Sequence, residues 1–161
     1  MRIAQGVEWA LHGCVNLAWL PAGTALPTAR LAELNELPAA YLNKQFQALA
    51  RAGIVVSRPG AGGGFALARP ANEISVLDIV QAIDGSDPAF RCTEIRQCGP
   101  VAAAPVDCRT PCQIASVMHG AERAWQAELA AVTVQSIADD VAAKSPDVPA
   151  RVAGFLTAGR T

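Results

Sequence analysis

The sequence predicts a mainly α-helical protein with one small β-hairpin. Apolar residues recur at helical spacing in most segments between residues 2 and 143. One glycine-rich stretch, residues 54–68, instead has the pattern of two short strands around a tip. We therefore expect a helical domain with a hairpin over residues 1–85, a loop over 86–112, one long helix over 113–143 and a flexible tail over 144–161.

Composition limits where the protein works. The chain has 161 residues, of which 52% are hydrophobic and only 5% are aromatic. It contains no run of about 18 apolar residues, so we expect no membrane-spanning helix. Glu8 and His12 interrupt the stretch that a signal peptide would need to be apolar. A cytoplasmic location follows, and there clustered cysteines favour metal ligation or redox chemistry over structural disulfides.

The charge of the chain is unevenly distributed. The formal net charge is −1, which does not by itself indicate a polyanionic partner. Residues 21–70, however, carry five basic and two acidic side chains, whereas residues 71–161 carry seven basic and eleven acidic ones. A basic segment beside an acidic remainder indicates contact with nucleic acid.

Residues 2–19 are predicted to form the first helix. Glu8 and His12 are four residues apart and share one face of it. Cys14 falls on the apolar face, where it is expected to be a small core residue. The apolar face comprises Ile3, Val7, Ala10, Cys14 and Leu17.

Two short helices with a tight turn between them follow. Thr28 is expected to cap a helix that runs through Leu34. Pro38 suits the first turn of the next helix, and Gly53 suits its C-terminal cap. This arrangement is typical of a helix-turn-helix, in which the second helix lies in the DNA major groove. Its predicted buried residues are Leu42, Phe46 and Leu49, and its predicted DNA-binding residues are Tyr41, Asn43, Lys44 and Gln47.

The hairpin comes directly after this second helix. Residues 54–57 and 65–68 are the expected strands, and Arg58 is expected to reach the minor groove or the phosphates. A hairpin in this place predicts the wing of a winged helix-turn-helix domain that binds double-stranded DNA; a flexible loop is the alternative. A phosphate-binding P-loop is excluded because no Gly-Lys-Ser/Thr follows the glycines. Ser75 then caps a helix that Gly85 ends.

The segment 113–143 predicts a helix that is longer than a small domain requires. At about 1.5 Å per residue it would span roughly 45 Å. An apolar stripe of this length indicates a partner helix across a two-fold axis, and hence a homodimer. Packing back onto its own domain is the alternative. The stripe comprises Ile114, Val117, Met118, Ala121, Trp125, Leu129, Val132, Ile137 and Val141.

Two stretches carry a family resemblance. "LPAAYLNKQFQALARAGIVVSRPGAGGGFALARPANEISVLDIVQAIDG" resembles the winged-helix segment of the IscR/NsrR/RsrR regulators, and "GVEWAL" resembles the opening of their first helix. The resemblance covers residues 1 to about 140, and the cysteine loop is most similar to that of the redox-sensing RsrR branch. It implies a homodimeric bacterial transcription regulator, not an enzyme, with an iron–sulfur cluster in the loop before the long helix.

The cysteines of the loop depart from the common pattern of that family. The family pattern has three cysteines with about five residues between neighbours, plus a fourth ligand from elsewhere. This chain keeps the spacing between Cys92 and Cys98, but Cys108 comes late and Cys112 follows four residues later. Cys112 precedes the long helix and matches the last cysteine of the family. Thiolates four residues apart at a helix N-terminus can point the same way, and the helix dipole stabilises them.

The resemblance also implies ligands from the first helix. In the nitric-oxide-sensing branch of the family, an acidic residue at the position of Glu8 completes the cluster from the partner subunit. His12 lies one turn further along. We expect a [2Fe–2S] cluster held by Cys108 and Cys112 of one subunit and by Glu8 and His12 of the other. Trp9 is then a residue that could repack when the cluster changes charge, or an ordinary buried aromatic residue.

The sequence alone leaves several alternatives open. Glu8 and His12 could form only an exposed ion pair and bind no metal. Cys92 or Cys98 could be cluster ligands instead. The metal site could be a structural zinc site, or absent. A thiol enzyme lacks support, because no Cys-His-Asp set is apparent and His119, two turns into the long helix, is expected at a surface or an interface.

Overall fold

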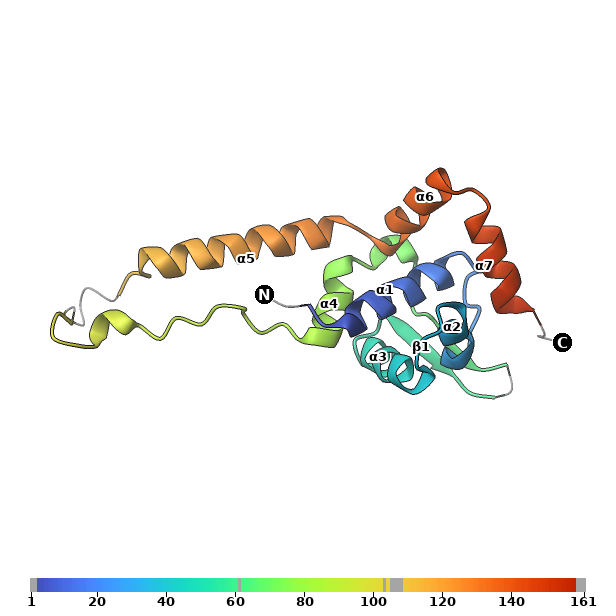
Figure 1. Cartoon of the computed structure of the whole chain (residues 1–161), viewed down its shortest axis with the longest axis horizontal. Helices are drawn as coiled ribbons and strands as arrows, with labels where there is room; N and C mark the ends of the chain where they lie inside the picture. Colours follow the sequence, from blue (N-terminus) through green and yellow to red (C-terminus); the bar gives the residue numbers. More distant parts are fainter. Residues whose placement is uncertain (1–2, 61, 103, 105–108, 159–161) are drawn as a thin grey trace. The chain divides into compact units, whose positions relative to one another are not determined.

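The computed structural model describes residues 3–60, 62–102, 104 and 109–158 (Figure 1). The chain forms two compact units. The larger unit comprises Arg2–Ser86 and Leu129–Thr161, and the smaller unit comprises Asp87–Glu128. No helix within the described ranges is both long and apolar enough to cross a membrane.

The larger unit is helical apart from one antiparallel hairpin, which confirms the predicted fold class. The strands pair Val55 with Leu67 and Arg58 with Gly64, so both strands begin and end within one residue of the predicted bounds. Its elements are α1 (Gln5–Ala18), α2 (Thr28–Leu34), α3 (Ala39–Arg51), β1 (Val55–Arg58), β2 (Gly64–Leu67), the short 3₁₀ helix η1 (Ala71–Glu73), α4 (Val76–Asp84), α6 (Val134–Lys144) and α7 (Val148–Thr157).

The core forms where α1 packs against α3. Phe46 is fully buried, and its ring lies 5.4 Å from that of Phe65. A β-carbon at Gly13 would lie 2.6 Å from the Phe46 ring, so the absence of a side chain at this position lets the two helices approach. Cys14 is fully buried in the same core, as predicted, and burial raises the pKa of its thiol to about 12.

Local signals set several helix ends. Gly53 has φ +70° just after α3. At the start of α4, the side chain of Ser75 accepts a hydrogen bond from the backbone N–H of Asp78, and the Asp78 carboxylate accepts one from the backbone N–H of Ser75. Both caps confirm the prediction. Thr28 differs, because it is the first residue of α2 and does not cap it. Its hydroxyl instead donates to Asn43 Oδ1 at 3.3 Å.

The base of the hairpin is locked to the turn before α2. Leu26 and Phe65 exchange two backbone hydrogen bonds, of 2.9 and 2.8 Å. Gly64 adopts φ +134°, and a β-carbon there would overlap the Leu26 carbonyl. Glycine is therefore required at position 64 both by backbone conformation and by space.

The prediction of one continuous helix over 113–143 is wrong. The segment forms two helices, α5 (Gln113–Ala131) and α6, with a break at Val132 and Thr133. The break is pinned by two backbone hydrogen bonds of 2.9 Å, from Val76 N–H to Val132 O and from Val134 N–H to Ile74 O. Thr133 then caps α6 through the backbone N–H of Ser136. A tertiary contact therefore ends α5 where the apolar periodicity continues.

The prediction of a flexible tail over 144–161 is also wrong for residues 148–157. These residues form α7, in which Leu156 is fully buried. Pro149 lies in the first turn, which tolerates proline, and Asp147 accepts a hydrogen bond from Arg151 at 3.1 Å. The C-terminal region is thus part of the core of the larger unit.

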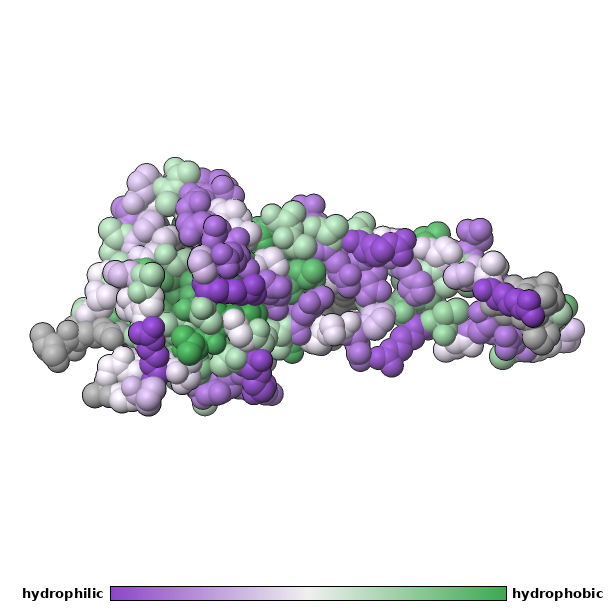
Figure 2. All heavy atoms as spheres, turned by 180° about the vertical axis from the view of Figure 1, so that it is seen from behind, coloured by the Kyte–Doolittle hydropathy of each residue, from purple (hydrophilic) through white to green (hydrophobic). Residues whose placement is uncertain are grey.

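The smaller unit contains most of α5 and the segment that leads to it. That segment includes η2 (Ile95–Gln97). The backbone N–H of Ala89 donates to Glu122 at 3.0 Å, and the Phe90 ring lies edge-on 5.9 Å from His119. His119, expected at a surface or interface, is therefore half-buried against Phe90. Figure 2 shows hydrophobic residues of this unit scattered among hydrophilic ones on the face that it draws.

Replacing Gly64 with alanine should destabilise the larger unit by roughly 2–4 kcal/mol, because strained backbone and steric overlap act together. Chemical denaturation followed by circular dichroism measures this change. Gly60→Ala is the matched control, since Gly60 also has a positive φ but has open space around it. It should cost about 1 kcal/mol. Equal losses for the two variants would contradict the locked hairpin base.

Candidate functional site

One face of α3 presents polar side chains outward. Tyr41, Asn43, Lys44 and Gln47 are all exposed, whereas the opposite face of the helix is buried in the core. Exposure of these four residues agrees with the prediction. Arg51, which sequence reasoning did not select, lies on the same side as Lys44 and Gln47 and is also exposed. The spacing of three and four residues between them would have identified it.

Two contacts anchor the exposed face of α3 to neighbouring helices. The Tyr41 ring meets Trp9 of α1 edge-on, with centroids 5.0 Å apart and planes at 77°. The Asn43 side chain accepts the hydroxyl of Thr28 at the start of α2. The orientation of α3 is therefore fixed from α1 and from α2 at once.

Arg58 lies at the end of β1 and is exposed. A β-carbon at Gly23 would lie 3.1 Å from Arg58 Nη2, so the guanidinium extends along the turn that precedes α2. Arg58 thus places a cation beside the helix-turn-helix, as a wing residue would require.

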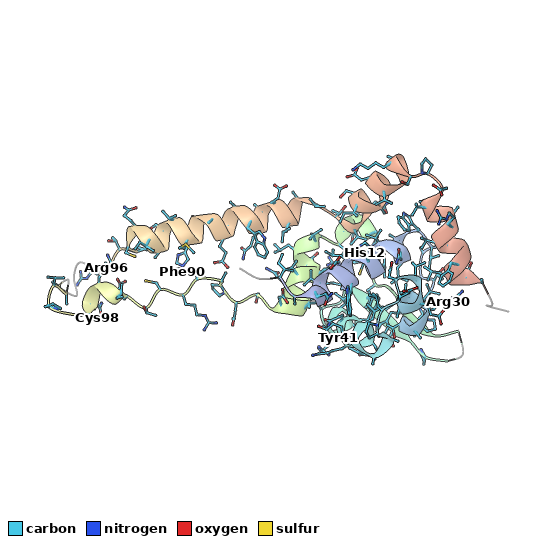
Figure 3. All side chains as sticks on the ribbon, in the orientation of Figure 1. His12, Arg30, Tyr41, Phe90, Arg96 and Cys98 are labelled. Carbon is cyan, nitrogen blue, oxygen red and sulfur yellow. The ribbon has the colours of Figure 1, made fainter. Side chains whose placement is uncertain are left out.

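Glu8 and His12 are both exposed side chains of α1. Figure 3 labels His12 on this helix. Within the described part of the chain, neither side chain forms a hydrogen bond or an ion pair, so the exposed Glu–His ion pair does not form. Both border a cavity of about 410 Å³ whose other walls are apolar. The other lining residues are Ile3, Val7, Leu11, Val15, Val76, Val80, Leu129 and Ile137. A carboxylate and an imidazole are thus left available at the edge of an apolar hollow.

Cys112 stands directly before α5. Its sulfur is partly exposed and accepts the backbone N–H of Ala115 at 3.3 Å. This hydrogen bond holds the sulfur of Cys112 at the N-terminus of α5. Cys108, the other predicted thiolate ligand, lies outside the described residues.

A polar contact braces the segment before Cys112. Arg96 donates to the Glu94 carboxylate and, at 3.0 Å, to the carbonyl of Thr110. The hydrogen bond from Arg96 lowers the pKa of Glu94, which keeps that carboxylate ionised. Figure 3 labels Arg96 near Cys98, which is exposed like Cys92. Arg96 binds a backbone carbonyl, so no residue pattern in the sequence marks this contact.

The described residues do not by themselves form a metal site. Among the described residues, no three His, Cys, Asp or Glu side chains come together in a way that could hold a metal ion. The structure does provide one cysteine, Cys112, with an N–H aimed at its sulfur, and the exposed carboxylate of Glu8 and imidazole of His12. Cys14 is excluded as a ligand because its thiol is buried and stays protonated.

Comparisons with known proteins indicate the family and the fold. The profile of Rrf2, described as an iron-dependent transcriptional regulator, matches residues 3–140. The HTH-type transcriptional regulator IscR of Pectobacterium atrosepticum is 32% identical over 98 residues, which are 61% of this chain and only 60% of that protein. The solved structure of T. potens IscR has a TM-score of 0.65 at 20% identity and covers 90% of this chain and 91% of that one. The crystal structure of the oxidised form of Staphylococcus aureus CymR has a TM-score of 0.61 at 24% identity and covers 86% of this chain and 96% of that one.

The rate of alkylation should distinguish the exposed cysteines from the buried one. Cys92 and Cys98 are exposed, so iodoacetamide at pH 8 should label them while the protein is native. Cys14 has a pKa of about 12 and should react only in denaturant. Peptide mass spectrometry of samples quenched over time measures the rates. Labelling of Cys14 in native protein as fast as Cys92 would contradict its burial.

Proposed function

The chain belongs to the Rrf2 family, which consists of transcriptional regulators and not of enzymes, and we propose that this member is a homodimer whose DNA affinity follows the redox state of a [2Fe–2S] cluster. The observation that carries the proposal is the contact between Trp9 and Tyr41. It joins the turn of α1 that bears Glu8 to the helix that faces DNA. Bound to chromosomal DNA, such a regulator works in the bacterial cytoplasm.

The DNA interface consists of α3 and the hairpin. Tyr41, Asn43, Lys44 and Gln47 enter the major groove, and Arg58 contacts the minor groove or the phosphates. Arg51, on the same side of α3, adds a phosphate contact. Two such surfaces in a symmetric dimer would bind half-sites about 34 Å apart. This assigns residues 1–85 the role of the DNA-binding domain.

The dimer is supported by α5. Ile114 and Val117 are 68% and 67% exposed, and Met118 is 43% exposed. These residues are three and four positions apart, so they share one side of the helix. An exposed apolar side on a helix favours a second copy of the chain, which would bury it across a two-fold axis. In this arrangement α5, and not the whole of residues 113–143, is the dimerisation helix.

The cluster is assigned four ligands. Cys108 and Cys112 bind it from one subunit, in the loop formed by residues 86–112, and Glu8 and His12 bind it from the other. The cluster, when bound, accepts and returns one electron. The residues of the chain position these ligands. Arg96 holds the loop before Cys112, and the Ala115 N–H donates to the sulfur of Cys112. The ring nitrogen of His12 that does not bind iron can hold or release a proton.

The signal passes from the ligands to DNA along α1. A change in the charge of the site alters the force on Glu8, and Trp9 follows it in the chain. Because the Trp9 ring abuts Tyr41, repacking of Trp9 changes the position of Tyr41 in the major groove. We assign the tighter DNA binding to the oxidised form. A structural zinc site would leave the protein colourless, so a visible absorption spectrum separates the two possibilities.

Replacing Cys112 or Cys108 with serine should abolish the visible chromophore of protein that is reconstituted with iron and sulfide under anaerobic conditions, because each removes a thiolate ligand. Glu8→Ala and His12→Ala should leave a labile cluster with a shifted spectrum. Cys92→Ser and Cys98→Ser are the controls and should keep the wild-type spectrum. Bleaching in the control variants, with no effect in the Glu8 and His12 variants, would move the ligands to the front of the loop.

A mixed dimer tests whether ligands cross the interface. One subunit lacks Glu8 and His12, and the other lacks Cys108 and Cys112. If ligation crosses the two-fold axis, this dimer retains one complete site and about half of the wild-type absorbance. A mixed dimer that shows only the labile, spectrally shifted cluster of the Glu8 and His12 variants would show that all four ligands come from one chain.

Trp9→Leu should uncouple the cluster from DNA. The affinities of oxidised and reduced wild-type protein should differ roughly 5- to 150-fold, which is typical of coupled sites. In the variant this ratio should fall toward one while the visible spectrum is retained. Anaerobic gel-shift titrations measure both forms.

Lys44→Ala is the control for that experiment. It should weaken the DNA binding of both forms equally and reduce the salt slope by about one unit, because it removes one positive charge from the surface that faces DNA. A Trp9 variant with an unchanged ratio would exclude this route.

A further inference from the structure

We propose that α7 is a clasp that holds α2, and through α2 the recognition helix α3, with Arg30 as the positioning residue that closes it. The inference rests on the proposed DNA-binding function. It assigns a role to a segment that lies beyond residues 3–140, the part of the chain that matches the family profile.

The clasp is a contact between one side chain of α2 and the end of α7. Arg30 Nη2 donates to the carbonyl of Phe155 at 2.6 Å, and the guanidinium carbon lies 4.0 Å from the centre of the Phe155 ring. Arg30 also pairs with Glu33 of α2. Figure 3 labels Arg30 on α2, beside α7. One guanidinium therefore fixes both the backbone and the ring of Phe155 to α2.

The position of Phe155 makes this contact favourable. It lies two residues before the end of α7, where the helix carries partial negative charge on its last carbonyls. An arginine there acts as a C-terminal cap supplied by another helix. Leu156, the next residue, is fully buried in the core. The end of α7 is thus held from two directions.

Apolar packing alone does not close the junction of α2 and α7. A cavity of about 440 Å³ lies among Leu34, Val148, Arg151, Val152 and Phe155. α2 is only seven residues long, and a helix of two turns depends on its neighbours for stability. The Arg30 contact therefore adds a polar tie between α2 and α7 to the apolar packing of α2 in the core.

The other end of α2 controls α3. The hydroxyl of Thr28 donates to Asn43 Oδ1 at 3.3 Å, and Leu31 and Ala32 are each 1% exposed in the core. A shift of α2 would therefore move or free a side chain that faces the major groove. The clasp lowers the ordering cost of DNA binding by holding this arrangement in advance.

Because of this contact, Arg30 is not counted among the positively charged residues that would bind DNA. Arg30 contributes to the positive charge of residues 21–70, but its side chain is only 28% exposed and is bound to Phe155 and Glu33. The proposal therefore treats Arg30 as a structural cation and not as a phosphate contact.

Phe155→Ala tests the clasp without changing the charge of the protein. The control is Arg151→Ala, on the same helix, whose side chain is 77% exposed and bonds to Asp147 of its own turn. The full-length cluster-loaded protein is used. The readouts are hydrogen exchange of the α2 and α5 amides, and binding to a duplex selected by the wild-type protein from a random-sequence library, at several salt concentrations.

In Phe155→Ala, the α2 amides should exchange faster than in the control and the α5 amides at the same rate. DNA affinity should fall roughly five- to tenfold with an unchanged salt slope. Arg30→Lys keeps the charge but cannot bridge the same partners, and it should weaken binding in the same way. A visible spectrum equal to that of the wild type confirms that the cluster site is intact.

Two results would overturn the clasp. α2 exchange and DNA affinity equal to those of the control would show that α7 does not hold α2. Tighter binding with a steeper salt slope would show that Phe155 instead masks Arg30 from the phosphates. If the wild-type protein selects no duplex, the proposed DNA-binding function fails, while the exchange data still test the clasp.

Discussion

Burial of one side of α1 is the constraint on which the larger unit depends. Gly13 lets the Phe46 ring of α3 approach, and Cys14 fills the space beside it. Because this side is committed to the core, Glu8 and His12 must face outward on the other. The same helix therefore builds the domain and presents the proposed ligands, and it cannot move without changing the packing of α3.

The recognition helix is held at three places of different chemistry. Apolar packing fixes its inner side, the edge of Trp9 meets Tyr41, and a weak side-chain hydrogen bond joins Asn43 to Thr28. The last two contacts each involve few atoms, so they can change without unfolding the core. This division suits a regulator, in which the fold must persist while the groove-facing side chains shift by small amounts.

Local patterns were sufficient for much of the fold. Apolar periodicity located α1 and α3, and Ser75, Gly53 and Gly85 marked helix ends through capping chemistry that acts within a few residues. The break between α5 and α6 was missed because it depends on pairing with Ile74 and Val76, far away in the sequence. α7 was missed because two prolines and two glycines suggested a loosely held tail, whereas tertiary burial of Leu156 stabilises it.

The site was predictable only where side chains carry the chemistry. The exposed face of α3 and the availability of Glu8 and His12 followed from helical spacing, but Arg96 and Arg30 bind backbone carbonyls that no pattern marks.

The proposed function depends above all on ligation of one cluster by cysteine thiolates together with a carboxylate and an imidazole. Pulsed electron paramagnetic resonance of reduced protein grown with ¹⁵N-histidine tests it directly. The account predicts a nitrogen coupling that His12→Ala removes and His119→Ala leaves intact; a reduced cluster with no nitrogen coupling would contradict it.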